Sequence, residues 1–170
     1  MSPMQKDPAP EPWRKLSETL AGHLMVYARG LLASEFILLD RENMEIGDLE
    51  IHGLRGAELK AGDAQARIER LSLSRYRMLS SGAEILTSAG DATSPEITYL
   101  NHPYEASLSL LCNKAKAGRP GHNATIRIKG GLTNRNYEAF FEPGDEGSLP
   151  VAFFLLYRLV SLRREAYRAG

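Results

Sequence analysis

The apolar run near the C-terminus, residues 149–162, constrains the fold more than any other feature of this sequence. Ser148 and Pro150 predict the start of a helix, because serine is a good N-cap and proline in the first turn gives up an amide that has no intrahelical partner. From Val151 to Tyr157 every residue is apolar, so the predicted helix has no polar face. Such a helix must be surrounded on all sides, either by protein or by lipid.

Protein surrounds this helix more plausibly than a bilayer does. Spanning a bilayer takes about 20 apolar residues, and Arg158 interrupts the run after only nine, counted from Leu149. We therefore predict no transmembrane segment and a buried central helix over about residues 149–166. A buried guanidinium needs a carboxylate or several carbonyls, so Arg158 either reaches water at the end of its enclosure or finds a partner on a strand. The predicted structural residues of this helix are Phe153, Phe154, Leu156 and Arg158.

Composition and charge are those of an ordinary globular protein. Of 170 residues, 43% are hydrophobic and 25% are charged, with 21 basic and 21 acidic side chains. This balance excludes the strong positive field of a typical nucleic-acid-binding protein, so no nucleic-acid partner is predicted. We predict a single domain over residues 13–170, preceded by a disordered, proline-rich tail over residues 1–12. No secretory signal is visible, and the predicted location is cytoplasmic, as a monomer or small oligomer.

The sequence lacks the usual catalytic and cofactor motifs. It contains no Gly-x-Ser-x-Gly, Walker or Gly-x-Gly-x-x-Gly motif, so no cofactor is predicted. Its four histidines stand far apart, so no metal site is predicted. The single cysteine, Cys112, suits a reducing compartment, and because it follows an apolar stretch we predict a buried, unreactive thiol. An enzyme would need a dispersed active site, for example His102 with Tyr104 and an acidic neighbour.

Between residues 34 and 141 the sequence alternates between short β-rich runs and turn residues. The clearest run with period 2 is 124–129, and Gly130 ends it. Such runs recur roughly every 8 to 12 residues, each with one polar face, which is typical of an all-β sandwich or barrel. Residues 115–123 are predicted to be a loop, and residues 14–28 fit either a helix or a strand.

A closed barrel around the C-terminal helix satisfies both patterns. A six-residue strand is about 20 Å long, and a helix over residues 149–162 is about 21 Å long, so the helix matches the strands that would enclose it. A barrel of roughly twelve strands is wider than the eight-stranded barrels whose own side chains fill the interior. A helix about 10 Å across is a suitable filling. The predicted fold is mainly β: a closed antiparallel barrel of about twelve strands around a buried hydrophobic C-terminal helix.

Two stretches of the sequence resemble the tubby C-terminal-like superfamily, which includes tubby proteins, phospholipid scramblases, plant LURP-one-related proteins and many bacterial proteins of unknown role. Residues 36–40, followed by the Ile-Gly pair at 46–47, are similar to its hairpin of strand, Asp-centred turn and strand. Residues 148–157, with the arginines at 163–164, resemble its central helix, which begins with Leu-Pro. The resemblance spans residues 13–168 and implies the same closed barrel around a buried helix. Tubby domains bind phosphoinositide head groups, and scramblases are associated with lipid and calcium, but no ligand residues of either group match positions in this chain.

Basic residues near the C-terminus form the strongest candidate binding site. Arg163, Arg164 and Arg168 lie at the end of the predicted helix, where they also interact favourably with the helix dipole. Lys114 and Lys116, in the predicted loop, would extend the same patch. We therefore predict a non-enzymatic binding or scaffold module for an anionic lipid head group or a protein partner. Because the helix fills the barrel, we expect no interior cavity, and an enzyme with a dispersed active site is the alternative.

Overall fold

The computed structural model describes residues 10–30 and 34–169 of the chain. Most of the predicted tail, residues 1–9, lies outside the described residues. The elements follow one another in this order: α1 (Pro10–Leu20), β1 (His23–Arg29), β2 (Glu35–Leu39), β3 (Glu45–Ile51), the 3-10 helix η1 (Gly53–Arg55), β4 (Gly56–Ala61), β5 (Ala64–Ser72), β6 (Arg75–Ser80), β7 (Ala83–Asp91), β8 (Ser94–Tyr99), β9 (His102–Ser109), β10 (Lys114–Gly118), β11 (Ile126–Gly130), β12 (Asn136–Phe140) and α2 (Ser148–Ala169).

The strands form one closed antiparallel barrel in the spatial order β1-β12-β11-β10-β9-β8-β7-β6-β5-β4-β3-β2, which confirms the predicted fold class. Every strand pairs with its neighbours in sequence, and β1 closes the barrel by pairing with both β2 and β12. Because successive strands run in opposite directions, their connections alternate between the two ends of the barrel.

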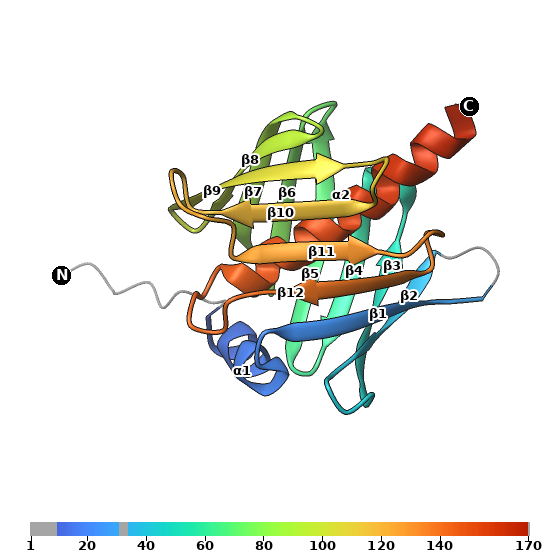
Figure 1. The fold of residues 1–170 in the computed structure, drawn as a ribbon. Helices are drawn as coiled ribbons and strands as arrows, with labels where there is room; N and C mark the ends of the chain where they lie inside the picture. Colours follow the sequence, from blue (N-terminus) through green and yellow to red (C-terminus); the bar gives the residue numbers. More distant parts are fainter. Residues whose placement is uncertain (1–9, 31–33, 170) are drawn as a thin grey trace.

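We name these ends by the helices. The α1 end holds α1, the start of α2 and the segments 40–44, 62–63, 81–82, 100–101, 119–125 and 141–147. The exit end holds the last turns of α2 and the segments 52–55, 73–74, 92–93, 110–113 and 131–135. Figure 1 shows α2 passing through the barrel and emerging at the exit end, beside the connection between β9 and β10.

Helix α2 is enclosed by the barrel over most of its length. All residues from Ser148 to Ser161 are buried, and the predicted core residues Phe153, Phe154 and Leu156 are at most 1% exposed. The helix begins one residue before the predicted range 149–166 and ends three residues after it. No helix in the described part of the chain is long and apolar enough to cross a membrane.

The first turn of α2 differs from the prediction that Ser148 caps it. The carbonyl of Gly147 accepts the amide of Val151 at 3.0 Å, whereas the Ser148 hydroxyl accepts the amide of Glu142 at 2.9 Å. Gly147 is required here because a Cβ would lie 2.5 Å from the phenol oxygen of Tyr104. Tertiary packing of the preceding loop therefore decides where the helix begins.

The segment that fitted either a helix or a strand contains both. Helix α1 ends at Leu20, a turn occupies residues 21–22, and β1 begins at His23. A positive φ at Ala21 and at Gly22 reverses the chain between them. Helical and β periodicities therefore overlap in sequence, which explains why neither pattern alone accounts for the segment.

Helix α1 covers one end of the barrel. Trp13 is 1% exposed, its ring centroid lies 5.9 Å from that of Phe153, and its Nε1 donates to Ser80 Oγ at 3.1 Å. Residues 10–12, which we predicted to be disordered, form the first turn of this helix. Docking of Trp13 inside the barrel mouth orders that turn.

The loop predicted at residues 115–123 is wrong in its first part. The segment Lys114–Gly118 is strand β10, paired with β9 and β11. Its inward-facing residues, Ala115 and Ala117, are 4% and 1% exposed. Alanine contributes little hydrophobic signal to a sequence pattern, yet a small side chain suits a strand that packs against α2. Lys114 and Lys116 consequently lie on the outer face of the sheet and not in a loop.

The Ile-Gly pair of the hairpin motif also has a physical reason. A Cβ at Gly47 would overlap the backbone carbonyl of Lys60, where β3 lies against β4. The register between β2 and β3 shifts between Leu38 and Leu39, in the same hairpin. Only glycine allows this close approach of two backbones.

Candidate functional site

The predicted arginine cluster is not one open patch, and Arg163 is its most buried member. Arg163 is 6% exposed. Its Nε donates to Asn134 Oδ1 at 2.8 Å, its Nη1 to the Leu110 carbonyl, and its Nη2 to Tyr167 Oη at 3.2 Å. These bonds tie the β9–β10 and β11–β12 connections to α2. Arg163 therefore braces the exit end, and its donors are occupied by the protein itself.

The other two arginines of the cluster have different surroundings. The guanidinium of Arg164 lies 5.6 Å from the ring centroid of Phe36, and burial lowers the pKa of Arg164. The side chain of Arg168 is 78% exposed and forms an ion pair with Glu165 at 3.6 Å. Of the three predicted ligand-binding arginines, only Arg168 is well exposed, and a carboxylate accompanies it.

Arg158 finds its partner on a strand, as one of the two predicted alternatives required, but the partner is a phenol. Its Nη1 donates to Tyr76 Oη on β6 at 2.9 Å, and the guanidinium lies 4.3 Å from the ring centroid of the same tyrosine. Tyr76 in turn donates to the Leu54 carbonyl at 3.2 Å. Burial lowers the pKa of Arg158. A contact with the ring and one hydrogen bond to its hydroxyl thus take the place of the expected carboxylate or carbonyls.

A basic hollow lies on the outer face of β9, β10 and β11. We call it the basic groove and define it by six residues: Lys114, Lys116, Arg127, Lys129, Ser107 and Ser109. Its four cations are all exposed and form two cross-strand pairs, Lys114 opposite Lys129 and Lys116 opposite Arg127. The hollow has a volume of about 760 Å³. The groove contains both predicted lysines, whereas Arg127 and Lys129 were not predicted as site residues.

The four cations of the basic groove have no ion-pair partner among the described residues. Within the described residues none of them forms an ion pair, and no carboxylate lines the hollow. Across from Lys129 on β12 stands Glu138, whose carboxylate contacts His23 at 2.6 Å instead. Lys129 itself lies over the ring of Phe140, 5.6 Å from its centroid. None of the four cations is therefore held in an ion pair by the part of the chain that the structure describes.

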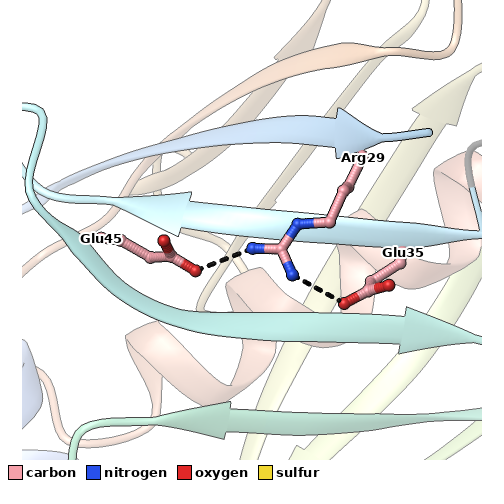
Figure 2. A network of polar contacts seen from close by, with 3 residues as sticks. All are labelled: Arg29, Glu35 and Glu45. Carbon is pink, nitrogen blue, oxygen red and sulfur yellow. Dashed lines mark hydrogen bonds and ion pairs between the residues drawn. The ribbon is translucent and has the colours of Figure 1, made fainter.

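Arg29, on the same barrel, differs from these four cations because it forms two ion pairs. Figure 2 shows Arg29 of β1 between Glu35 of β2 and Glu45 of β3, with N–O distances of 3.1 and 2.9 Å. Such exposed ion pairs contribute only about 0–1 kcal/mol to stability, but they neutralise the charge. In the basic groove, like charges stand directly opposite one another, which destabilises a sheet by a comparable amount. The groove therefore keeps its charge at some expense of stability.

The prediction that Cys112 is a buried thiol is wrong. Cys112 is exposed, in the connection between β9 and β10, and it lines the basic groove at the exit end. Of the leucines just before it, Leu108 is 5% exposed but Leu111 is 94% exposed. The strand ends at Ser109 and the chain turns through Asn113, which has a φ of 53°. The apolar alternation therefore stops before the cysteine.

The residues named for an enzyme are only partly brought together. Tyr104 Oη donates to Asp145 Oδ2 at 2.8 Å, and Arg119 donates to Asp145 Oδ1 at 2.9 Å while lying 4.7 Å from the Tyr104 ring centroid. Burial, and next the hydrogen bond to Asp145, raise the pKa of Tyr104. His102 is exposed, and no hydrogen bond or ion pair between described residues joins it to this cluster. The cluster anchors the segment 141–147 that leads into α2, which is a structural role.

One group of potential metal ligands was not found from the sequence. The ligand atoms of Glu50, His52 and Glu58 all lie within 4.8 Å of one another. Glu50 and Glu58 are directly opposite on β3 and β4, and this register is the part that the sequence does not reveal. All three side chains are exposed. Exposed acidic groups commonly lie this close without an ion, so we assign no metal site to them.

Comparison with known proteins identifies the fold. No family model matches the chain, and no curated protein matches its sequence. Among solved structures, the X-ray structure of the protein AT5G01750 from Arabidopsis thaliana is similar, with a TM-score of 0.57 and 11% sequence identity over 91% of this chain and 96% of the plant protein. The plant protein has the LURP-one/tubby-like fold. At this identity the likeness is one of fold alone.

Proposed function

We propose that this protein is a non-enzymatic binding module that holds a phosphate-bearing anion in the basic groove. We also propose that it is a cytoplasmic member of the tubby C-terminal-like superfamily, on the strength of its hairpin and helix motifs and the fold it shares with the plant protein. The observation that carries the functional proposal is a set of four exposed cations around one hollow without a carboxylate among the described residues.

The size and chemistry of the groove suit a polyphosphorylated ligand. Ligand sites commonly enclose about 300–1,000 Å³, and the groove measures about 760 Å³. Ammonium and guanidinium groups form charge-assisted hydrogen bonds to phosphate oxygens, and the hydroxyls of Ser107 and Ser109 add neutral donors. Because α2 fills the barrel interior, a ligand is accommodated on the outer face.

Binding of an anion would also relieve the repulsion within the groove. Lys116 and Arg127, like Lys114 and Lys129, are held side by side by backbone pairing, whatever their charges. A phosphate between them replaces a repulsive pair by two attractive contacts. The ligand therefore stabilises the folded chain as well as binding to it, and the melting temperature rises with ligand concentration.

The exposed cysteine offers a direct test. Because the chain has one cysteine and it lines the groove, an environment-sensitive fluorophore attached to Cys112 reports on occupancy without further substitution. Inositol hexakisphosphate is the probe, titrated near physiological salt. We expect a saturable fluorescence change whose midpoint moves to higher ligand concentration as salt is added.

Substitutions identify the groove as the site. Replacing Lys116 and Arg127 together by glutamine should weaken binding by about tenfold or more, since a hydrogen bond to a charged group contributes about 1.5–3 kcal/mol. The control is Lys60→Gln with Arg67→Gln, which removes two exposed cations from β4 and β5. Equal affinities for the two variants, or no binding by the unsubstituted protein, would overturn the proposal. The groove variant should melt no lower than the parent protein, because it loses a like-charge pair.

A further inference from the structure

The formal charges of this neutral chain are separated between the two ends of the barrel. The described residues of the α1 end include eight carboxylates and four basic side chains, a net charge of −4. The exit end, with α2 counted from residue 162, has five basic side chains and one carboxylate, a net charge of +4. Opposite ends of two copies therefore attract each other, whereas like ends repel.

The exit end also has an open apolar hollow beside α2. The hollow has a volume of about 310 Å³ and is lined by Leu110, Leu111, Arg163, Ala166 and Tyr167. Leu111 is 94% exposed and Tyr167 is 65% exposed, so the hollow faces solvent. Of the large apolar side chains that are exposed in the described chain, only Met44 belongs to the α1 end, where it is 61% exposed.

Met44 stands on a turn that hydrogen bonds hold in one shape. Asp40 Oδ1 accepts the amides of Glu42 and Met44, each at 2.9 Å, and the Asp40 amide donates to the Met44 carbonyl at 3.0 Å. Arg41, the basic residue of this turn, donates to the Ala21 carbonyl of its own barrel at 3.1 Å. Because Glu42 is exposed as well, the turn presents a methionine and a carboxylate together.

We propose that a second copy of this chain docks on the exit end, with Met44 of the second copy in the hollow beside α2 and its Glu42 near Arg168. Methionine is flexible and fills irregular apolar sites. Arg168 is 78% exposed, and its ion pair with Glu165 at 3.6 Å is an exposed one, which contributes little, so a second carboxylate can bind to it. This contact does not depend on an anion in the basic groove.

The distribution of charge favours a head-to-tail contact over a two-fold dimer. A two-fold contact places the same surface of both copies face to face, so it would set +4 against +4 or −4 against −4. A head-to-tail contact pairs +4 with −4 instead. The chain itself thus carries both the basic hollow and the acidic turn with a protruding methionine, which is why we infer a second copy and not a different protein as the occupant.

Sedimentation equilibrium of the full chain tests the contact. The mass is measured from about 10 µM to about 1 mM protein, a range in which weak contacts associate. The salt concentration is about 10 mM or about 150 mM, where the Debye length is about 30 Å or about 8 Å. We expect the weight-average mass to rise with protein concentration above the monomer value of 18.8 kDa. Association should weaken about tenfold or more at the higher salt.

Two variants block the two sides of the contact separately. Met44→Lys removes the apolar tip, and Ala166→Lys places a cation in the hollow; both positions are exposed, so both variants should melt close to the parent protein. Each variant alone should stay monomeric. Their equal mixture should form a species of twice the monomer mass and no larger, because one intact hollow meets one intact methionine while the other contact sets lysine against lysine.

Thr98→Lys is the matched control, because it adds the same charge to the outer face of β8, away from both ends. This variant should associate as the parent protein does. A parent protein that stays monomeric at about 1 mM and low salt would overturn the proposal. Association of either end variant as strong as that of the parent would also overturn it. A mixture that stays monomeric would show that the two blocked surfaces do not belong to one head-to-tail contact.

Discussion

At the α1 end the barrel is sealed by an apolar helix face, whereas at the exit end it is sealed by polar groups of α2. Trp13 reaches inside the mouth and contacts Phe153 ring to ring. At the opposite mouth, Arg158 bonds to Tyr76, and Tyr157 Oη donates to the Gly53 carbonyl at 2.9 Å. One seal therefore depends on the hydrophobic effect, and the other depends on hydrogen bonds to the carbonyls and phenols of the rim.

The two ends also differ in what they leave outside. At the α1 end the large apolar residues of α1 are buried, with Trp13, Leu16 and Leu20 at no more than 6% exposure, and Met44 is exposed. The exit end leaves Leu111 and Leu132 exposed to water, and the basic groove, whose cations form no ion pair among the described residues, reaches this end at Cys112. The contrast separates stability from binding: substitutions at the α1 end should unfold the protein, and substitutions on the outer surface of the exit end should change only what it binds.

Removing the helix that both ends share should have the largest effect. Cutting the chain after Gly147 deletes α2, and burial of each large apolar side chain contributes about 1.5–3 kcal/mol. The deleted apolar residues include Leu149, Val151, Phe153, Phe154, Leu155, Leu156, Leu159 and Val160. Together these eight contribute about 12–24 kcal/mol, which is comparable to or larger than the usual net stability of about 5–15 kcal/mol, so residues 1–147 should not fold. A cooperative thermal transition near that of the intact chain would contradict the enclosed-helix architecture.

A pair of single substitutions compares the ends directly. Trp13→Ala should lower the free energy of unfolding by about 3–5 kcal/mol, because it opens a large cavity at the α1 end. Leu132→Ala, at the exit end, should change that free energy by no more than about 0.5 kcal/mol. Urea denaturation of both variants measures the difference. Comparable losses would mean that the exit-end leucines contribute to stability after all, and the contrast between the ends would be lost.

The polar seal can be tested by removing one partner or both. Tyr76→Phe leaves the buried guanidinium of Arg158 without its hydrogen bond and should lower the free energy of unfolding by about 1–3 kcal/mol. Arg158→Met replaces the charge by an apolar chain of similar length and should be neutral or stabilising. In the double variant, Tyr76→Phe should lower the free energy of unfolding much less than it does on its own. Strictly additive effects would show that the two side chains are not coupled.

Alkaline pH should weaken the fold gradually. Burial raises the pKa of Tyr104 at the α1 end and the pKa values of Tyr137 and Tyr157 towards the exit end. The folded state therefore keeps these protons above about pH 10, where unfolded tyrosines lose them. The resulting stability is fully present below that pH and is lost as the pH rises through it, by at most about 1.4 kcal/mol per pH unit for each tyrosine.

Tyr157→Phe provides the matched measurement. The variant lacks one of the raised pKa values, so its free energy of unfolding should fall less steeply between pH 9 and pH 11 than that of the parent protein, even if its stability at neutral pH is lower. Urea denaturation across this range gives the two slopes. Parallel slopes would show that the phenol of Tyr157 does not take part in the linkage.

Local periodicity was enough to predict the architecture. Residues 151–157 predict a helix with no polar face, which must be buried. The repeated strand patterns predict the sheet that surrounds it, and the similar lengths of helix and strand indicate that one fits inside the other. The motifs at 36–40 and 46–47 pointed to the same fold, and close packing at Gly47 explains one of them. These signals lie in neighbouring residues, so a sequence displays them without reference to distant parts of the chain.

The candidate site depended on tertiary structure. Strand β10 was not predicted because its inward-facing residues are alanines, which contribute little to a hydrophobic pattern. They are buried because α2 packs behind them. Once β10 pairs with β11, Lys116 meets Arg127 and Lys114 meets Lys129, whereas Arg163 turns inward to brace two loops. Register and barrel closure bring these groups together across the chain. The sequence by itself determined that a helix is enclosed by strands. Only the tertiary structure decided which charged side chains gather on the outer face and which form bonds within the barrel, because the strands and loops that bring them together are far apart in sequence.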